Sequence, residues 1–204
     1  MTDWSERRAA WDTRYETDEY RWGFEPNEFV VRNAGALPPG TALDLGCGRG
    51  GNAIWLAKRR HRVTGVDWSQ AAIAQARSIA SEQGVEVEFV VADLLAWRPT
   101  DRYDLVLLSY VQLPPAERPR VHARAVEALA PGGTVLLVAH HLDNLEHGVG
   151  GPQTPEVLYT EEQLGEDFAS LVIDLNDKVL RHVDREDAVG DAIDAALIAR
   201  KITT

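Results

Sequence analysis

The feature that most constrains this chain is a glycine-rich segment at residues 44–51, Asp-Leu-Gly-Cys-Gly-Arg-Gly-Gly. It follows a mostly apolar run at 41–45 and precedes a helix-like stretch at 51–60, Gly-Asn-Ala-Ile-Trp-Leu-Ala-Lys-Arg-Arg. A strand that passes through glycines into a helix brings the backbone close to a ligand at the strand's carboxyl end. The segment therefore predicts an α/β fold with a ligand site at this turn, the strand covering 41–47.

The alternation of strand and helix patterns continues along the chain. Further strands are expected at 62–67, 85–93, 103–110 and 134–140, with helices from the N-cap Ser69 to about Gly84 and from Pro114 through Ala130. Such alternation implies right-handed crossovers in a parallel sheet. Residues 141–159 read as a long loop, followed by a short helix near 161–169. Two final strands, within 171–183 and 191–202, are joined by the charged turn 184–191, which makes a closing hairpin.

Composition limits the classes of partner. The 204 residues suit one domain, and 21 basic against 32 acidic residues give a net charge of -11, which disfavours nucleic acid and anionic membranes. The single cysteine, Cys47, excludes an internal disulfide, and no apolar run is long enough to span a membrane. The polar N-terminus does not resemble a signal peptide, so we expect a cytoplasmic protein. The dominance of arginine over lysine indicates a bacterial, GC-rich source.

The glycine segment satisfies two different ligand patterns. Gly46, Gly48 and Gly51 match the dinucleotide pattern G-x-G-x-x-G, and the acidic Asp67 follows near the expected ribose-binding position. Asp44, however, would repel a pyrophosphate and would suit the ammonium group of a methionine moiety. Asp93, at the end of the third strand, adds an acceptor for an adenine amino group. These acids favour S-adenosylmethionine over NAD.

The motifs LDLGCGRG, VTGVDWS, VVADL and LAPGGTVLLVAH, in this order over residues 41–140, resemble the class I S-adenosylmethionine-dependent methyltransferases. The likeness implies a Rossmann-like doubly wound sheet of seven strands, mostly parallel, in the order 3-2-1-4-5-7-6 with an antiparallel C-terminal hairpin. It also implies a reaction that leaves S-adenosylhomocysteine as product. The cofactor-binding residues implied are Asp44, Gly46, Cys47, Gly48, Gly50, Asp67, Trp68, Asp93, Leu94, Ser109 and Tyr110.

The resemblance assigns roles within that set. The loop glycines would lie under the methionine part, Asp67 would hold both ribose hydroxyls, and Trp68 would lie against ribose or adenine. Asp93 would bind the adenine amine, with Leu94 packed on the ring. Ser109 and Tyr110 would flank the sulfonium, where an aromatic face stabilises a cation. Cys47 is expected to be a small buried residue without chemistry of its own.

The N-terminal part is similar to the bacterial tellurite-resistance and thiopurine-type small-molecule methyltransferases. We predict a lid segment at 1–35 and a cofactor-binding domain at 36–204. The lid residues, which would exclude water during transfer, are Trp11, Tyr15, Tyr20 and Trp22, with Arg14 among them. The tellurite enzymes place a His and an Arg beside the acceptor from their late hairpin. Residues 181–185, Arg-His-Val-Asp-Arg, differ from that arrangement.

The acceptor side is expected after the fifth strand, where His140, His141 and His147 fall within eight residues. A general base that takes a proton from an OH, NH or SH acceptor is one interpretation of His140 or His141, with Tyr110 as a further catalytic candidate. A metal site is the other interpretation, but no additional ligand completes it, so no metal is predicted. Histidines that only hydrogen-bond the loop are the structural alternative.

The predicted function is methyl transfer from S-adenosylmethionine to a small-molecule O, S, N or chalcogen nucleophile, by a monomer or homodimer. A non-catalytic S-adenosylmethionine-binding sensor or partner module is the alternative. An NAD oxidoreductase is disfavoured by Asp44 and by the lack of a substrate domain. Nucleic-acid methylation is disfavoured because residues 109–115, Ser-Tyr-Val-Gln-Leu-Pro-Pro, contain no Asn-Pro-Pro-Tyr motif.

Overall fold

The computed structural model describes residues 4–17, 24–185 and 188–203. Its seven strands form a mixed sheet in the order β3-β2-β1-β4-β5-β7-β6, which confirms the predicted fold class and strand order. The chain divides into two compact units, Met1–Arg98 and Pro99–Thr204. Among the described residues, no helix combines the length and apolar character that a membrane crossing requires.

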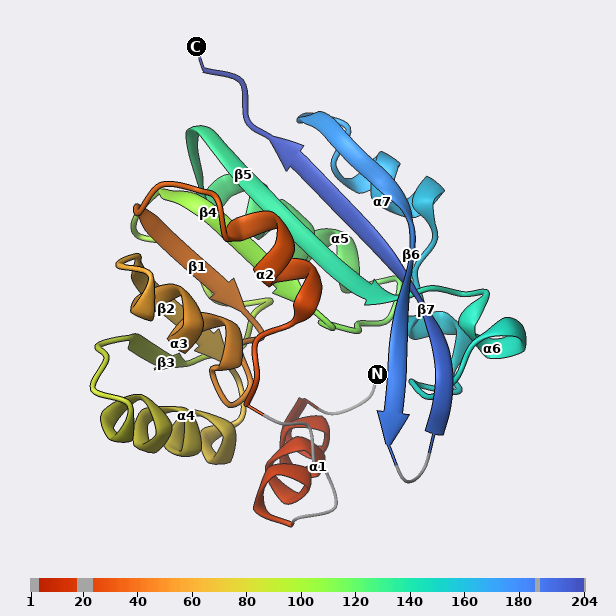
Figure 1. Ribbon diagram of the computed structural model, residues 1–204, viewed down its shortest axis with the longest axis horizontal. Coiled ribbons are helices and arrows are strands. Elements are labelled where there is room, and N and C mark those ends of the chain that lie inside the picture. The colour runs from red at the N-terminus through yellow and green to blue at the C-terminus, as the bar shows by residue number, and fades with distance from the viewer. Residues whose placement is uncertain (1–3, 18–23, 186–187, 204) are drawn as a thin grey trace. The chain divides into compact units, whose positions relative to one another are not determined.

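The first unit contains a three-stranded parallel sheet and its helices (Figure 1). Its elements are α1 (Trp4–Glu16), α2 (Glu28–Ala34), β1 (Thr41–Leu45), α3 (Gly51–Lys58), β2 (Arg62–Asp67), α4 (Gln70–Glu82) and β3 (Glu88–Val91). Apolar side chains of β1, β2, α3 and α4 make the core. Its fully buried members include Leu43, Val66, Leu56 and Ile73. This apolar filling is the reason the strands read as near-continuous hydrophobic runs.

Polar side chains define where the helices of the first unit begin. Ser69 caps α4 as predicted, because its hydroxyl accepts the backbone N–H of Ala72 at 3.1 Å. Asn27 caps α2 and also donates its backbone N–H to the side chain of Asn52 at 2.8 Å. The second contact ties the segment before α2 to the first turn of α3.

The second unit carries the antiparallel part of the sheet. Its elements are β4 (Tyr103–Ser109), α5 (Arg118–Ala128), β5 (Leu129–His140), α6 (Asn144–His147), a 3-10 helix (Pro155–Val157), α7 (Glu161–Asp167), β6 (Val172–Arg185) and β7 (Ala188–Arg200). β4 and β5 are parallel, whereas β7 runs antiparallel to both β5 and β6. Beyond the pair His140–Asp194, β6 and β7 continue together as a two-stranded arm past the end of β5 (Figure 1).

Several boundaries differ from the sequence-based expectation: β5 begins at Leu129 instead of 134, and β3 covers only Glu88–Val91 of the expected 85–93. The helix expected from Pro114 begins at Arg118, because Pro114 and Glu117 close a turn (2.9 Å) and the buried Arg118 side chain binds the carbonyls of Glu156 and Leu158. The expected loop at 141–159 contains α6 and the 3-10 helix. The charged turn expected at 184–191 is mostly strand, since Arg185 already pairs with Ala188.

Candidate functional site

The loop after β1 has a backbone shape that depends on glycine. Gly46, Gly48 and Gly50 have φ angles of 72°, 51° and 81°, in the left-handed region. A Cβ at Gly50 would lie 2.9 Å from the ring of Phe89, and one at Gly48 would lie 2.8 Å from the hydroxyl of Tyr15. Neighbouring side chains therefore leave no room for a Cβ on either side of the loop. Such a backbone can approach a ligand closely.

Asp44 stands on β1 immediately before this loop and is 1% exposed. Neither of its carboxylate oxygens has a hydrogen-bond partner among the described residues. Burial, helped by the nearby charge of Asp67, raises the pKa of Asp44 to about 7. A buried carboxylate without a partner is costly. The arrangement fits a residue whose carboxylate is paired when a cationic ligand binds.

Asp67 at the end of β2 is bound to the same loop. Its carboxylate accepts the backbone N–H of Gly48 and that of Ser69, each at 2.9 Å. Burial nevertheless raises its pKa above the ordinary value. Each oxygen keeps one lone pair for a ligand hydroxyl, so the predicted ribose-binding role stays a prediction that the geometry permits.

The other predicted cofactor residues of the first unit lie at its strand ends. Trp68 is partly buried, and the guanidinium of Arg7 lies 5.3 Å from its ring centroid. Asp93 follows β3 and accepts the N–H of Leu95 at 2.9 Å, which leaves its second oxygen for a ligand, while Leu94 is half-buried beside it. Cys47 is buried, and burial raises the pKa of its thiol well above the ordinary value. Cys47 is therefore a neutral thiol, as expected of a residue without chemistry.

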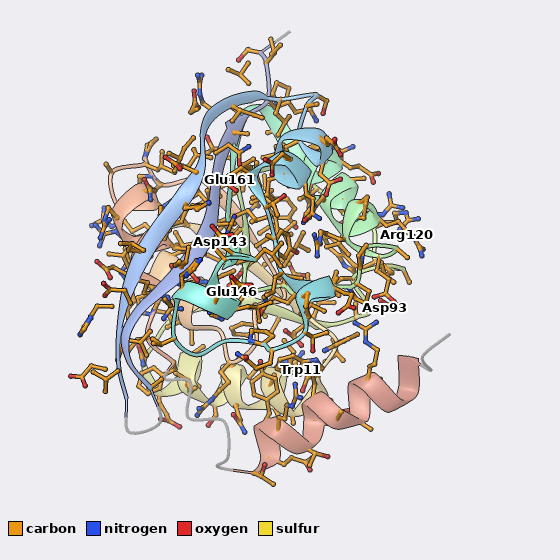
Figure 2. The ribbon with its side chains drawn as sticks, turned by 90° about the vertical axis from the view of Figure 1, so that its right-hand side faces the viewer. Trp11, Asp93, Arg120, Asp143, Glu146 and Glu161 are labelled. Carbon is orange, nitrogen blue, oxygen red and sulfur yellow. The ribbon has the colours of Figure 1, made fainter. Side chains whose placement is uncertain are left out.

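Helix α1, on which Figure 2 labels Trp11, is attached to α4 by polar contacts. Asp12 accepts the Ser69 hydroxyl at 2.6 Å and the Ala71 N–H at 3.2 Å, so it adds a second cap to α4. The carbonyl of Tyr15 accepts from the side chain of Gln75 at 2.6 Å, and its ring lies 6.0 Å from that of Trp11. Two of the predicted lid residues thus lie in this helix. The other two, Tyr20 and Trp22, fall outside the described residues.

In the second unit, four side chains form a polar cluster, which we call the Asp194 cluster: Tyr110, His140, Arg181 and Asp194. Tyr110 donates to Asp194 Oδ2 at 2.6 Å, and Arg181 Nε donates to both the Tyr110 hydroxyl (2.7 Å) and Asp194 Oδ2 (2.8 Å). His140 Nδ1 lies 3.2 Å from Asp194 Oδ1. The contact does not meet the geometry of a hydrogen bond, so it is a close polar contact between the imidazole and the carboxylate.

The protonation states within the Asp194 cluster follow from these contacts. Burial acts to raise the pKa of Asp194. Its contacts with His140, Arg181 and Tyr110 outweigh burial and hold the pKa below its ordinary value. Burial and the Asp194 charge raise the pKa of Tyr110 well above its ordinary value. Asp194 is therefore a carboxylate and Tyr110 a neutral hydroxyl, which donates and does not act as a base.

The remaining predicted residues of the second unit have different surroundings. His141 is 2% exposed and both ring nitrogens are engaged: Nδ1 accepts the Asp143 N–H at 2.9 Å, and Nε2 lies 2.7 Å from Glu161 (Figure 2). His147 is exposed next to Glu146. Ser109 ends β4 and is half-buried. No metal-binding group of three or more ligands exists in the part of the chain that the structure describes.

Sequence reasoning missed Asp194 as a candidate and considered Arg181 only for its position in the late hairpin. Asp194 interrupts an otherwise apolar run, Ala-Ile-Asp-Ala-Ala-Leu-Ile, and such a charge on a buried strand is a signal that it has a partner. Asp12 was also missed. Nothing in the sequence distinguishes it from the other acidic residues of α1.

Comparison with known proteins gives a consistent result. Residues 42–133 match a family model described as a methyltransferase domain. The chain is 28% identical over 165 residues to thiocyanate methyltransferase 1 of Arabidopsis thaliana, an alignment that covers 79% of this chain and 68% of that protein.

Solved structures share the fold over nearly the whole chain. The crystal structure of TehB from Haemophilus influenzae superposes with a TM-score of 0.73 at 22% identity, covering 95% of this chain and 66% of that one. The 1,6-didemethyltoxoflavin-N1-methyltransferase of Burkholderia thailandensis, solved with S-adenosylhomocysteine, gives 0.71 at 21%, covering 96% and 87%. Together with the glycine loop, the matched domain and the named relatives support the assignment of this chain to the class I S-adenosylmethionine-dependent methyltransferases, whose fold the solved structures share.

Proposed function

We propose that this enzyme holds S-adenosylmethionine on the glycine loop of its first unit and methylates a small-molecule nucleophile. The proposal rests on the burial of Asp44 without a hydrogen-bond partner among the described residues. When bound, the cofactor supplies a methyl group on a sulfonium that is already activated toward nucleophiles. The tasks left to the protein are to bind, orient and exclude water.

The residues of the first unit fit this cofactor. The charge of Asp67 adds to burial in raising the pKa of Asp44, and neither carboxylate oxygen of Asp44 has a hydrogen-bond partner among the described residues. A methionine ammonium would neutralise Asp44, whereas a dinucleotide pyrophosphate would face two acids. In the proposed assignment, Asp67 holds the ribose hydroxyls, while Trp68, Asp93 and Leu94 hold the adenine. Ser109 and Tyr110, at the end of β4, are proposed for the sulfonium side.

The relatives support a small acceptor of variable chemistry. One is named for thiocyanate and another is named as a probable thiol methyltransferase. The family model matches residues 42–133 of this chain, and most of the Asp194 cluster lies after this range. We assign the acceptor side to that later part of the chain.

The binding test compares Asp44→Asn with the wild-type protein by isothermal titration with S-adenosylmethionine, S-adenosylhomocysteine and NAD. Asn keeps the shape of Asp and removes the charge that pairs with the ammonium. We expect the two sulfur nucleotides to bind about 10- to 100-fold more weakly to the variant, the equivalent of about 1.5–3 kcal/mol for a charged hydrogen bond. The exposed Glu86→Gln variant is the matched control and is expected to bind like wild type.

Asp67→Ala is the less informative variant, because it also removes the acceptor of the Gly48 and Ser69 backbone groups and so disturbs the loop itself. Unchanged affinity in Asp44→Asn, or binding of NAD in place of the sulfur nucleotides, would refute the proposal. Once binding is established, screening thiols, phenols, amines and chalcogen oxyanions for methylation identifies the acceptor.

We further propose the lid at 1–35 and the cofactor domain at 36–204 as functional parts of a cytoplasmic bacterial enzyme that is a monomer or homodimer. The position of Tyr15 against Gly48 supports the lid. The arginine-rich composition and the single cysteine support the source and the compartment.

A further inference from the structure

The Asp194 cluster joins side chains from β5, β6 and β7, and from the residue after β4, around the carboxylate of Asp194. His140 is the last residue of β5 and the direct cross-strand neighbour of Asp194 on β7. Tyr110 follows β4, and Arg181 lies on β6. Asp194 is 1% exposed, whereas the His140 side chain is 12% exposed. A buried carboxylate thus stands behind a histidine that keeps access to solvent.

The His140 ring is held in one orientation from several sides. The Tyr110 ring centroid lies 4.8 Å from that of His140. The Gly151 backbone, at φ 78°, lies so close that a Cβ there would be 3.0 Å from Nδ1 and Cε1 of the imidazole. Tyr110 itself has a left-handed φ of 55°, which costs a non-glycine residue about 1–2 kcal/mol and occurs mainly where function demands it.

We propose that Asp194, supported by Arg181 and Tyr110, is a positioning residue that keeps the proton of His140 on Nδ1 and leaves Nε2 free as the general base for the methyl acceptor. The carboxylate next to Nδ1 favours the protonated form of that nitrogen. Arg181 and the Tyr110 hydroxyl bind Asp194 Oδ2 and fix its orientation. His141 cannot serve in this way, since both its nitrogens are already engaged.

The proton balance is simple and rests on the proposed methyl transfer. The acceptor X–H bond breaks, its proton passes to Nε2 of His140, and its electron pair forms the bond from X to the methyl carbon. The carbon–sulfur bond breaks at the same time, and its electrons stay on sulfur in the departing S-adenosylhomocysteine. His140 then returns the proton to solvent. Such a base is needed only for acceptors that carry a proton.

The first test reads the imidazole directly. We expect long-range ¹H–¹⁵N NMR of the wild-type enzyme to show His140 with Nδ1 protonated and Nε2 unprotonated. The His140→Gln variant assigns the ring signals. In Asp194→Asn the ring is expected to shift toward the Nε2–H form. Asp191→Asn is the matched control: Asp191 lies 3.2 Å from His182 Nδ1 on the same hairpin, but both side chains are at least 60% exposed. A wild-type ring with the proton on Nε2 would overturn the proposal whatever the turnover.

The second test compares two probes, an alkyl thiol below its pKa and iodide, which carries no proton. We expect Asp194→Asn to slow methylation of the thiol by about 100-fold, within the range that a general base contributes, and to change iodide methylation less than about twofold. Equal losses for both probes would indicate a merely structural role and refute the proposal. Titration of each variant with S-adenosylmethionine separates the outcomes: absence of binding by wild type refutes the proposed function, whereas normal binding with an unchanged tautomer in Asp194→Asn refutes only this inference.

Discussion

At the scale of single residues, the candidate site contains groups that destabilise the folded protein. Asp44 is buried without a partner, and Tyr110 adopts a backbone angle that non-glycine residues rarely take. Native proteins keep such groups where function requires them. The two residues come from different motifs, one before the glycine loop and one at the end of β4. Their cost is the physical reason for proposing that they belong to the binding and acceptor sides.

The raised pKa of Asp44 predicts a specific dependence of stability on pH. The folded protein keeps the Asp44 proton up to a pH of about 7, whereas the unfolded chain releases it near its ordinary pKa of 3.8. The stability of the wild-type protein therefore falls across this window as pH rises. We expect Asp44→Asn, which carries no charge to bury, to gain about 2–4 kcal/mol relative to wild type between pH 4 and pH 8.

Urea unfolding of the ligand-free proteins at several pH values checks this prediction. The Glu86→Gln control should show a constant difference from wild type, because Glu86 is exposed. A pH-independent difference between Asp44→Asn and wild type would mean that Asp44 is not a buried titrating group in solution.

At the scale of elements, α1 is the segment whose position the sequence predicts least. It is attached through Asp12 and the carbonyl of Tyr15 to the first turns of α4, and it places the Tyr15 hydroxyl at Gly48. Few apolar side chains contribute, since most of its described side chains are exposed or half-buried. A helix held mainly by polar contacts opens at low cost, which the proposed lid role requires.

Asp12→Ala tests this attachment. It removes the acceptor for the Ser69 hydroxyl and the Ala71 N–H, a capping contact worth about 1 kcal/mol. We expect hydrogen exchange of the α1 amides to become faster and the affinity for S-adenosylmethionine to fall about two- to tenfold. Glu16→Ala, an exposed change in the same helix, should alter neither quantity. If exchange in α1 is unchanged, Asp12 does not hold the lid.

At the scale of the whole molecule, charge disfavours nucleic acid as the methyl acceptor. The net charge of -11 repels phosphate backbones over distances of a Debye length, and the basic run at 58–62 is too short to compensate. We expect no binding of a fluorescent DNA duplex or RNA in anisotropy titrations at low ionic strength. Binding that weakens steeply with added salt would reveal a basic groove and would contradict a small-molecule acceptor.

Much of the fold followed from local patterns. The glycine loop, the Ser69 cap and the order of strands and helices all depend on residues close in sequence, so periodicity and turn chemistry were sufficient to predict them. The boundaries that failed depend on distant partners. Helix α5 begins late because Arg118 binds carbonyls about forty residues away, and the final turn is short because β6 and β7 pair almost to its tip.

The sequence by itself predicted the cofactor side, because its residues are consecutive or follow adjacent strands whose ends meet at one edge of a parallel sheet. The proposed acceptor side depends on tertiary structure. His140 and His141 are adjacent and chemically alike, yet His140 lies beside Asp194 through Nδ1, whereas both ring nitrogens of His141 are engaged by Glu161 and the Asp143 backbone. That distinction arises from cross-strand pairing of residues 54 positions apart, which no local pattern encodes.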